Sequence, residues 1–450
     1  MRRLLFRAFR ATWVIQHWMA RRFTSAGLLV LGGILAASVV GLDTNRTLAY
    51  QAFTFLVALL GAALLASLTF RGQFRVRRVM PRFGTAGEPL SYRVFVQNDG
   101  PRPARGLALL EEIADPRPSL AEFLAAREPG EERRNWFDRT VGYPRWMWLI
   151  GQRQGSLGGA RPLPPLLPGA EVETRVEAVP ARRGRLRLVG VTIARPDPFG
   201  LFRGFVRVPA PQSVLVLPRR YPVPDLDLPG NRKYQQGGVA LAASVGDSEE
   251  FASLRDYRPG DPLRRIHWRS WARMGRPIVK EYQDEFFVRH ALVLDTFARG
   301  GAGAGEIFEE AVSVAASFAV AIPSQDSLLD LMFVGPEAYC FTAGRGLAHA
   351  DRMLEVLAGV EPCTGRSFDV LRDSVLKRHG ELSGAICVLL GWDDQRRALV
   401  RSLRALGIPT LTLVVTRAGE GDAGAETAAD RTLAPHRLVA GRIAEGLADL

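Results

Sequence analysis

Cysteine is scarce in this 450-residue sequence, and its three cysteines lie far apart. Cys340, Cys363 and Cys387 include no Cys-x-x-Cys pair, so neither a disulfide framework nor a zinc site is predicted. No Gly-Lys dipeptide occurs, which excludes a Walker A phosphate-binding loop. His-Glu-x-x-His and Gly-x-Ser-x-Gly motifs are also absent. We therefore expect a protein that is not an enzyme, with no catalytic residue and no bound cofactor.

Acidic residues are missing from two basic segments near the N-terminus. Residues 1–22 carry six arginines and residues 71–82 carry five, with no acid in either segment. The whole chain has 59 Lys+Arg against 46 Asp+Glu, a net charge of +13, so only +2 remains for residues 83–450. A nucleic-acid groove needs a one-sided positive excess. We therefore expect no nucleic-acid partner.

Charge of either sign is missing from two long apolar runs, residues 23–42 and 47–70. Each run is long enough to cross a bilayer as a helix, at about 20 residues per span. Together they predict a transmembrane helical hairpin over residues 23–70. Arginine-rich flanks stay in the cytoplasm, so we expect a multi-pass protein of the bacterial plasma membrane with a cytoplasmic N-terminus, 1–22, and cytoplasmic soluble domains. A cleaved signal peptide is the alternative interpretation of the first run.

Strand-like alternation dominates residues 71–224. It recurs in segments such as 91–96, 171–177 and 213–217, which Gly/Pro turns separate. This pattern predicts an immunoglobulin-like antiparallel β-sandwich. An insertion at 114–170 is rich in proline, arginine and tryptophan. We expect it either to touch the membrane interface or to pack on its own sandwich.

Strands alternate with helices in residues 289–450, after a polar linker at 225–247. A continuous apolar strand at 290–295 ends in an acid, and the following segments alternate in the same way. This order is typical of a doubly wound α/β domain whose mainly parallel sheet is covered on both faces. We predict further strands at 328–334, 338–341, 385–390, 410–415 and 437–439, and helices at 306–322, 347–358, 368–377, 394–406 and 443–447.

A dense run of charges occupies residues 249–285, with eight bases and seven acids. Because the charges nearly balance, internal pairing explains them better than an anionic partner. Arginine pairs with carboxylates through a planar fork and stacks on indole rings. Residues 248–288 are therefore predicted to form a charged clasp, which either docks the linker onto the α/β domain or binds a partner. Its expected members are Arg255, Asp261, Trp268, Trp271 and Arg273.

This charged segment resembles the bacterial family called domain of unknown function fifty-eight. The residues that carry the resemblance are Arg255, Asp256, Tyr257, Gly260, Asp261, Arg265, His267, Trp268 and Arg273. A second motif of that family is matched by the turn Asp197, Pro198, Phe199 and Gly200. His267 departs from the pattern, since many relatives have aspartate there.

The resemblance implies a C-terminal domain like a von Willebrand factor A module. It also implies association with MoxR-type AAA+ ATPases and with transglutaminase-like membrane proteins. In such modules an Asp-x-Ser-x-Ser motif after the first strand holds a divalent cation, helped by a later acid. Here Asp295 is present, but Phe297 and Arg299 replace the two serines, and Asp393 stands near the later acid. An adjacent arginine repels Mg²⁺, so we expect a degraded site without metal, in which Asp295 caps its loop or pairs with Arg299.

These patterns predict a membrane-anchored, non-catalytic interaction protein. It would present a cytoplasmic domain to a partner such as a MoxR-like ATPase. A divalent-cation-dependent ligand-binding module is one alternative, and a hydrolase assembled from distant residues is another. The patterns leave the ligand and the oligomeric state open.

Overall fold

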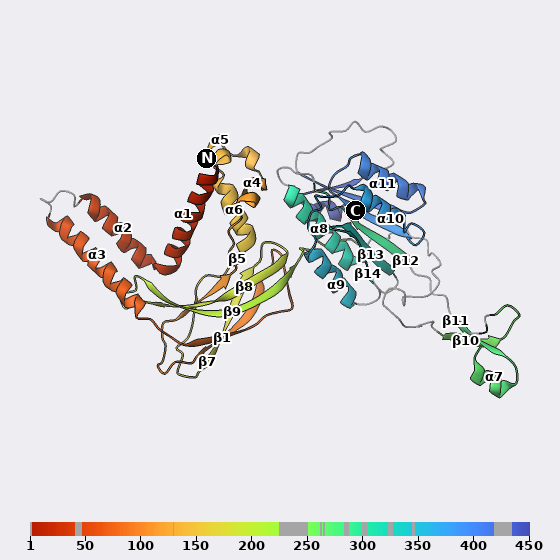
Figure 1. The fold of residues 1–450 in the computed structure, drawn as a ribbon, viewed down its shortest axis with the longest axis horizontal. Helices are drawn as coiled ribbons and strands as arrows, with labels where there is room; N and C mark the ends of the chain where they lie inside the picture. The colour runs from red at the N-terminus through yellow and green to blue at the C-terminus, as the bar shows by residue number, and fades with distance from the viewer. Residues whose placement is uncertain are drawn as a thin grey trace. The chain divides into compact units, whose positions relative to one another are not determined.

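The computed structural model describes most of the chain (Figure 1). The chain divides into two compact units, Met1–Leu217 and Pro218–Leu450, close to the predicted domain boundary at residue 224. The predicted linker, 225–247, lies outside the described residues. Those residues are 2–40, 47–128, 130–224, 251–261, 263, 266–282, 288–298, 304–322, 327–343, 347–417 and 434–450.

Three helices open the first unit: α1 (Arg2–Arg22), α2 (Ser25–Val40) and α3 (Thr47–Leu68). The charge pattern alone did not predict α1. In the described part of the chain, one helix is long and apolar enough to cross a membrane, over Leu48–Leu68 of α3. The 16 residues of α2 extend for about 24 Å, which is less than the roughly 30 Å of hydrocarbon in a bilayer. A crossing by two helices therefore stays a prediction.

The faces of α2 and α3 are strongly apolar and open to solvent. The two helices pack side by side (Figure 1), yet Leu48 is 81% exposed. An apolar surface of this extent is typical of a region that contacts lipid or another protein. The large side chains exposed on the two helices include Leu29, Leu35, Val39, Leu48, Phe55, Leu65 and Leu68.

The rest of the first unit is the predicted β-sandwich, formed by two sheets around one core. One sheet has the order β1 (Phe74–Val79), β3 (Leu90–Asn98), β7 (Glu171–Val179), β5 (Ser156–Leu157). The other has the order β2 (Phe83–Thr85), β9 (Arg203–Leu217), β8 (Gly184–Pro196), β4 (Ala108–Ile113), β6 (Arg161–Pro162). Alternate residues of β3 point into the core, where Val94 and Val96 pack with Val191 and Ile193 of β8. The period-2 pattern of the sequence thus identifies the buried face.

The insertion at 114–170 is largely helical and packs on α1. It contains α4 (Leu120–Ala125), a 3₁₀ turn η1 (Glu131–Arg133), α5 (Trp136–Val141) and α6 (Tyr143–Gln154), followed by the short strands β5 and β6. Trp146 of α6 is fully buried against Phe6 and Phe9 of α1, with Phe123 of α4 beside it. The expectation that the insertion packs on its own sandwich is confirmed for β5 and β6, which pair with β7 and β4, whereas the packing of its helices on α1 was not predicted.

A six-stranded sheet forms the core of the second unit. Its order is β14 (Ala338–Ala343), β13 (Ser327–Val334), β12 (Val288–Leu294), β15 (Gly384–Leu389), β16 (Thr410–Thr416), β17 (His436–Val439). All pairs are parallel except β13 with β14. Every residue of β15 is buried, which requires cover on both faces of the sheet. The helices are α8 (Ala304–Ala321), α9 (Leu347–Ala358), α10 (Asp369–Leu376), α11 (Asp394–Ala405) and α12 (Ile443–Ala448).

The topology of this sheet creates a switch point between β12 and β15. β12 is first in the chain, β13 lies on one side of it and β15 on the other. The loops that leave the carboxyl ends of β12 and β15 therefore run to opposite sides, and in open α/β sheets ligands bind at such switch points. Asp295 follows β12 directly, and Asp393 precedes α11 after β15.

The charged segment folds as an antiparallel hairpin of β10 (Phe251–Asp256) and β11 (Ile278–Tyr282). A short helix, α7 (Trp268–Met274), lies between the two strands in the chain. We keep the name clasp for residues 251–282. The sequence patterns predicted its charge pairing but not its strands.

Candidate functional site

Asp295 is completely buried at the carboxyl end of β12. Its Oδ1 accepts a hydrogen bond from the backbone N–H of Phe297 at 2.9 Å, and its Oδ2 accepts one from that of Leu390 at 3.0 Å. The carboxylate thus joins the loops that follow β12 and β15. This confirms the expectation that Asp295 caps its loop, while Arg299, its expected ion-pair partner, lies outside the described residues.

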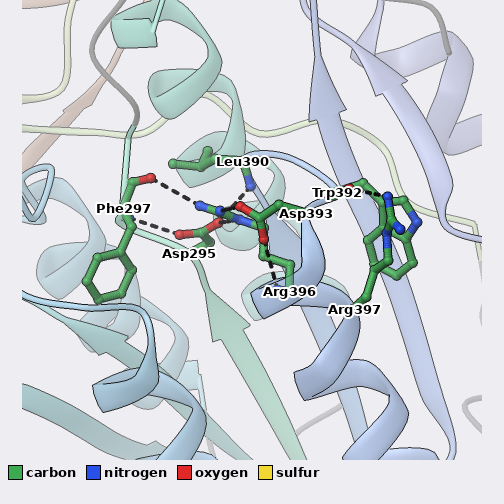
Figure 2. A network of polar contacts seen from close by, with 7 residues as sticks. All are labelled: Asp295, Phe297, Leu390, Trp392, Asp393, Arg396 and Arg397. Carbon is green, nitrogen blue, oxygen red and sulfur yellow. Dashed lines mark hydrogen bonds and ion pairs between the residues drawn. The ribbon is translucent and has the colours of Figure 1, made fainter. Parts of the chain in front are cut away.

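Arg396 of α11 holds the position between the two predicted acids (Figure 2). Its Nε donates to Asp295 Oδ2 at 2.6 Å and its Nη1 to Asp393 Oδ2 at 2.5 Å. Its Nη2 donates to the carbonyl of Phe297 at 3.1 Å, and its guanidinium lies 5.0 Å from the centre of the Phe368 ring. A cationic side chain of the protein therefore pairs with both of the carboxylates that resemble a divalent-cation site.

The start of α11 explains why Arg396 points into this site. Asp393 is the N-cap of the helix, and its Oδ1 accepts the backbone N–H of Arg396 at 3.0 Å. Residues three positions apart lie on one helix face, so Asp393 also meets the Arg396 side chain. The sequence patterns missed Arg396, although this Asp-x-x-Arg spacing at a helix start was visible.

Burial and the neighbouring charges have opposite effects on the pKa values of Asp295 and Arg396. Burial raises the pKa of Asp295, whereas Arg396 and the two backbone N–H donors oppose that rise. Burial alone would lower the pKa of Arg396, but the two carboxylates outweigh it and raise that pKa. Arg396 therefore remains cationic, and the site forms a closed, internally paired network.

A cavity of about 700 Å³ lies beside this network, past the carboxyl end of β13. Thr296 connects the two, because its carbonyl accepts the N–H of Cys363 at 2.8 Å and its hydroxyl bonds the carbonyl of Val334. A ligand in this cavity would meet both apolar and charged groups. Its lining includes Phe333, Tyr339, Glu355, Cys363 and Arg366.

The clasp brings Arg255 and Asp261 together, as the sequence predicted. Both terminal nitrogens of Arg255 donate to the Asp261 carboxylate, at 2.7 and 2.8 Å, in a bidentate ion pair. Asp261 also accepts the backbone N–H of Arg258 at 2.8 Å. Gly260, at φ +106°, makes the turn that places the acid there.

The other clasp residues occupy its surface. Trp268 stacks on Trp271, with ring centres 5.2 Å apart, and is 63% exposed. His267 Nδ1 lies 2.7 Å from the Ser270 hydroxyl, so this departure from the family pattern has a local partner. Asp256 pairs with the exposed Arg276, and the backbone N–H of Tyr257 donates to the carbonyl of Pro277. Of the other predicted residues, Arg273 is exposed and Arg265 lies outside the described residues.

We expect the Arg255–Asp261 pair to govern the acid stability of the clasp. The Arg255 fork, with the Arg258 N–H, lowers the pKa of Asp261 from 3.8 to about 2. Because the folded pKa is depressed, this stabilisation is complete above about pH 4 and is lost as the pH falls towards 2. In Arg255→Ala the Asp261 pKa should rise towards 3.8, as carboxyl ¹³C NMR titration would measure. Arg269→Ala, an exposed change in the same element, is the control, and an unshifted Asp261 in Arg255→Ala would contradict the assignment.

The turn Asp197, Pro198, Phe199 and Gly200 joins β8 to β9 and lies against the N-terminal helices. The Asp197 carboxylate accepts the backbone N–H groups of Phe199 at 2.7 Å, Leu201 at 2.9 Å and Phe202 at 2.5 Å. This arrangement presents the carbonyls of residues 200 and 201 to Thr24, whose hydroxyl donates to Gly200 O at 2.5 Å. The turn therefore fixes the junction between α1, α2 and the sandwich.

At Gly27 the backbone of α2 approaches the backbone of Leu201 very closely. A Cβ built on Gly27 would lie 2.0 Å from the carbonyl oxygen of Leu201, which excludes every side chain at this position. Phe23 and Phe202 form an isolated antiparallel bridge beside it. The resemblance marked the turn as a motif, but its contact with the helices was visible only in the structure.

Comparison with known sequences finds one family match that extends from the clasp into the α/β domain. Residues 253–414 match the family described as "Protein of unknown function DUF58". The "Uncharacterized protein YeaD" of Bacillus subtilis (strain 168) is 29% identical over 130 residues, which is 28% of this chain and 31% of that protein. The match thus spans less than a third of the length of YeaD.

Two structures of the CARDB domain of the PF1109 protein from Pyrococcus furiosus also resemble part of this chain. A crystal structure in complex with di-metal ions has a TM-score of 0.19 at 14% identity, covering 32% of this chain and 89% of that domain. A solution NMR structure gives 0.18 at 13% identity, with 32% and 93% covered. At these TM-scores neither bears on the fold or the ligands described here. The sequence match over residues 253–414, which include the Arg255–Asp261 pair and the Asp295–Arg396 network, supports the assignment of this part of the chain to the DUF58 family.

Proposed function

We propose that this chain is a membrane-anchored, non-catalytic interaction protein that presents its α/β domain to a partner at the membrane. The observation that carries the proposal is the position of Arg396 between Asp295 and Asp393. A cation-dependent module leaves such a position open for a metal and its ligand. Here a tethered guanidinium pairs with both acids, so binding by this domain is independent of divalent cations.

We further propose that the α/β domain is like a von Willebrand factor A module. The strand order, with one antiparallel edge strand and an aspartate after the first strand, supports this assignment. So do the acids Asp295 and Asp393, which both pair with Arg396. Fold alone does not set function, and the proposed role therefore rests on the chemistry of the Asp295–Arg396–Asp393 network and of the clasp.

Membrane anchoring is supported by the length of α3 and by the exposed apolar faces of α2 and α3. The arginines before α2 and after α3 favour a cytoplasmic location for both ends. A crossing by both helices, with the two soluble units in the cytoplasm of a bacterial cell, is part of the proposal. The partner comes from the family resemblance: a MoxR-like AAA+ ATPase, with a transglutaminase-like membrane protein as a further associate.

The exposed indole of Trp268 is the proposed contact on the clasp. Tryptophans of this kind contribute strongly to protein interfaces. In Trp268→Ala, recovery of the purified MoxR-like ATPase of the host bacterium on the immobilised full-length chain should fall at least tenfold. Leu263→Ala, equally exposed at 67%, should leave it unchanged.

The same capture experiment tests cation independence. Without added nucleotide, recovery of the ATPase should be equal in EDTA and in millimolar Mg²⁺. Loss of recovery in EDTA would favour the alternative, a divalent-cation-dependent binding module. Equal recovery by wild type and Trp268→Ala would remove the clasp as the docking surface.

A further inference from the structure

A cavity of about 530 Å³ lies in the first unit between α1 and β9. Four arginines line it: Arg21 and Arg22 from the end of α1, Arg117 from the insertion, and Arg207 from β9. Two tryptophans of α1, Trp13 and Trp18, complete one wall. The cavity is thus both cationic and aromatic, a combination that suits an anion attached to an apolar group.

Carboxylates neutralise these arginines only in part. One acid, Glu112, is shared between Arg21 at 3.2 Å and Arg207 at 3.5 Å. A second, Asp115, is occupied by Arg117 at 2.5 Å. The four guanidinium groups thus meet two carboxylates, which leaves an excess of positive charge in the cavity.

Arg22 is the arginine whose described contacts are not with an acid. Its Nη1 donates to the backbone carbonyl of Arg203 at 3.0 Å, and its guanidinium lies 4.2 Å from the centre of the Phe205 ring. Burial, followed by repulsion from Arg207 and Arg21, lowers the pKa of Arg22. An anion in the cavity would relieve this repulsion and would accept charge-assisted hydrogen bonds.

The cavity lies beside the point where the two apolar helices leave the sandwich. α1 ends at Arg22 and α2 begins at Ser25, next to the bridge between Phe23 and Phe202. At Gly204 of β9, an added Cβ would lie 2.7 Å from Phe70 Cβ and from the Ser67 carbonyl, at the end of α3. Phe205 and Arg207 of the cavity follow in the same strand.

This position sets the cavity at the level of lipid headgroups if α2 and α3 enter the bilayer. Trp18, with half of its surface exposed, matches the aromatic residues that gather at membrane interfaces. Clusters of arginine at that level attract anionic lipids. The charge and the location therefore indicate the same class of ligand.

We propose that this cavity binds the phosphate headgroup of an anionic membrane phospholipid, with Arg22 and Arg207 as its main ligands. The source of the phosphate, a lipid, rests on the proposed membrane anchoring. The anion site itself rests on the four arginines. Bound lipid would fix the corner between α1 and α2 against β9.

The test uses the full-length chain in a nonionic detergent, titrated with dioctanoyl phosphatidylglycerol and followed by calorimetry. We expect saturable binding, which Arg22→Gln and Arg207→Gln each weaken roughly tenfold. Arg207→Gln should keep the fold intact, because the Arg207 side chain is 73% exposed. Weaker binding by this variant would therefore not result from misfolding. Arg187→Gln, an exposed change on β8, should bind like wild type.

Three results would overturn the proposal: equal binding of dioctanoyl phosphatidylcholine, equal binding of inorganic phosphate, or unchanged affinity in both cavity variants. Equal binding of inorganic phosphate would show a free-anion site in place of a lipid site. Cell fractionation tests membrane anchoring independently of lipid binding by the cavity. A chain found in the soluble fraction that still prefers phosphatidylglycerol would remove the anchor and keep the site, whereas a membrane-bound chain without that preference would remove only the site.

Discussion

Replacing Arg396 with alanine is expected to lower the free energy of unfolding of the α/β domain by about 3–5 kcal/mol. The variant leaves the fully buried carboxylate of Asp295 without the cation that pairs with it, and removes the guanidinium that pairs with Asp393. Hydrogen exchange of the full-length chain, measured by mass spectrometry on peptides from β12 and β15, reports this change, because the innermost strands exchange mainly through global opening.

Arg401→Ala on the same helix is the matched control. Arg401 is exposed, so its loss should change stability by less than about 0.5 kcal/mol. Adding Asp295→Asn to Arg396→Ala should restore part of the loss, because the amide removes the uncompensated buried charge. If Arg396→Ala exchanged as slowly as Arg401→Ala, the network of Figure 2 would have no role in stability.

Replacing Asp197 with alanine should destabilise the sandwich and its junction with the helices by about 3 kcal/mol or more. The change removes the acceptor of three backbone N–H groups, and each buried donor left unpaired costs about 1–3 kcal/mol. Asp197 is 7% exposed, so water reaches these groups poorly. Faster hydrogen exchange in peptides from the turn, from β9 and from the start of α2 would measure the loss.

Phe199→Ala is the control in the same turn, because the Phe199 ring is 51% exposed and its backbone N–H is retained. It should leave exchange at the junction nearly unchanged. Asp197→Asn should fall between the two, since the amide keeps one acceptor oxygen. Destabilisation limited to the turn, with α2 unaffected, would contradict the role of Asp197 in holding the helices.

The elements that sequence patterns predicted well are those with a strong local period. β3 alternates because one face of its sheet is buried, and Ala291–Leu294 of β12 form a continuous apolar run because their sheet is covered on both faces. The clasp pair Arg255–Asp261 was also predictable, because a six-residue separation around a Pro-Gly turn leaves few other geometries.

The features that escaped prediction depend on contacts distant in sequence. Asp295 and Arg396 are 101 residues apart, and only the meeting of β12 with β15 brings them together. The helix α1 had a local signal, since Phe6, Phe9 and Trp13 repeat at helical spacing. The arginines of this segment were interpreted as a signal of membrane topology, and its packing on Trp146 was not predicted.

The close approach at Gly27 has a mechanical consequence. Backbone meets backbone there, at the turn between β8 and β9, so tilting of α2 is passed directly to that turn. The two strands have 13 and 15 residues, which is roughly 40–50 Å at about 3.3 Å per residue. A hairpin of that length acts as a lever arm, with its pivot at the helices. Its far end is Leu217, so a small rotation of the helix becomes a larger displacement at that end of the hairpin.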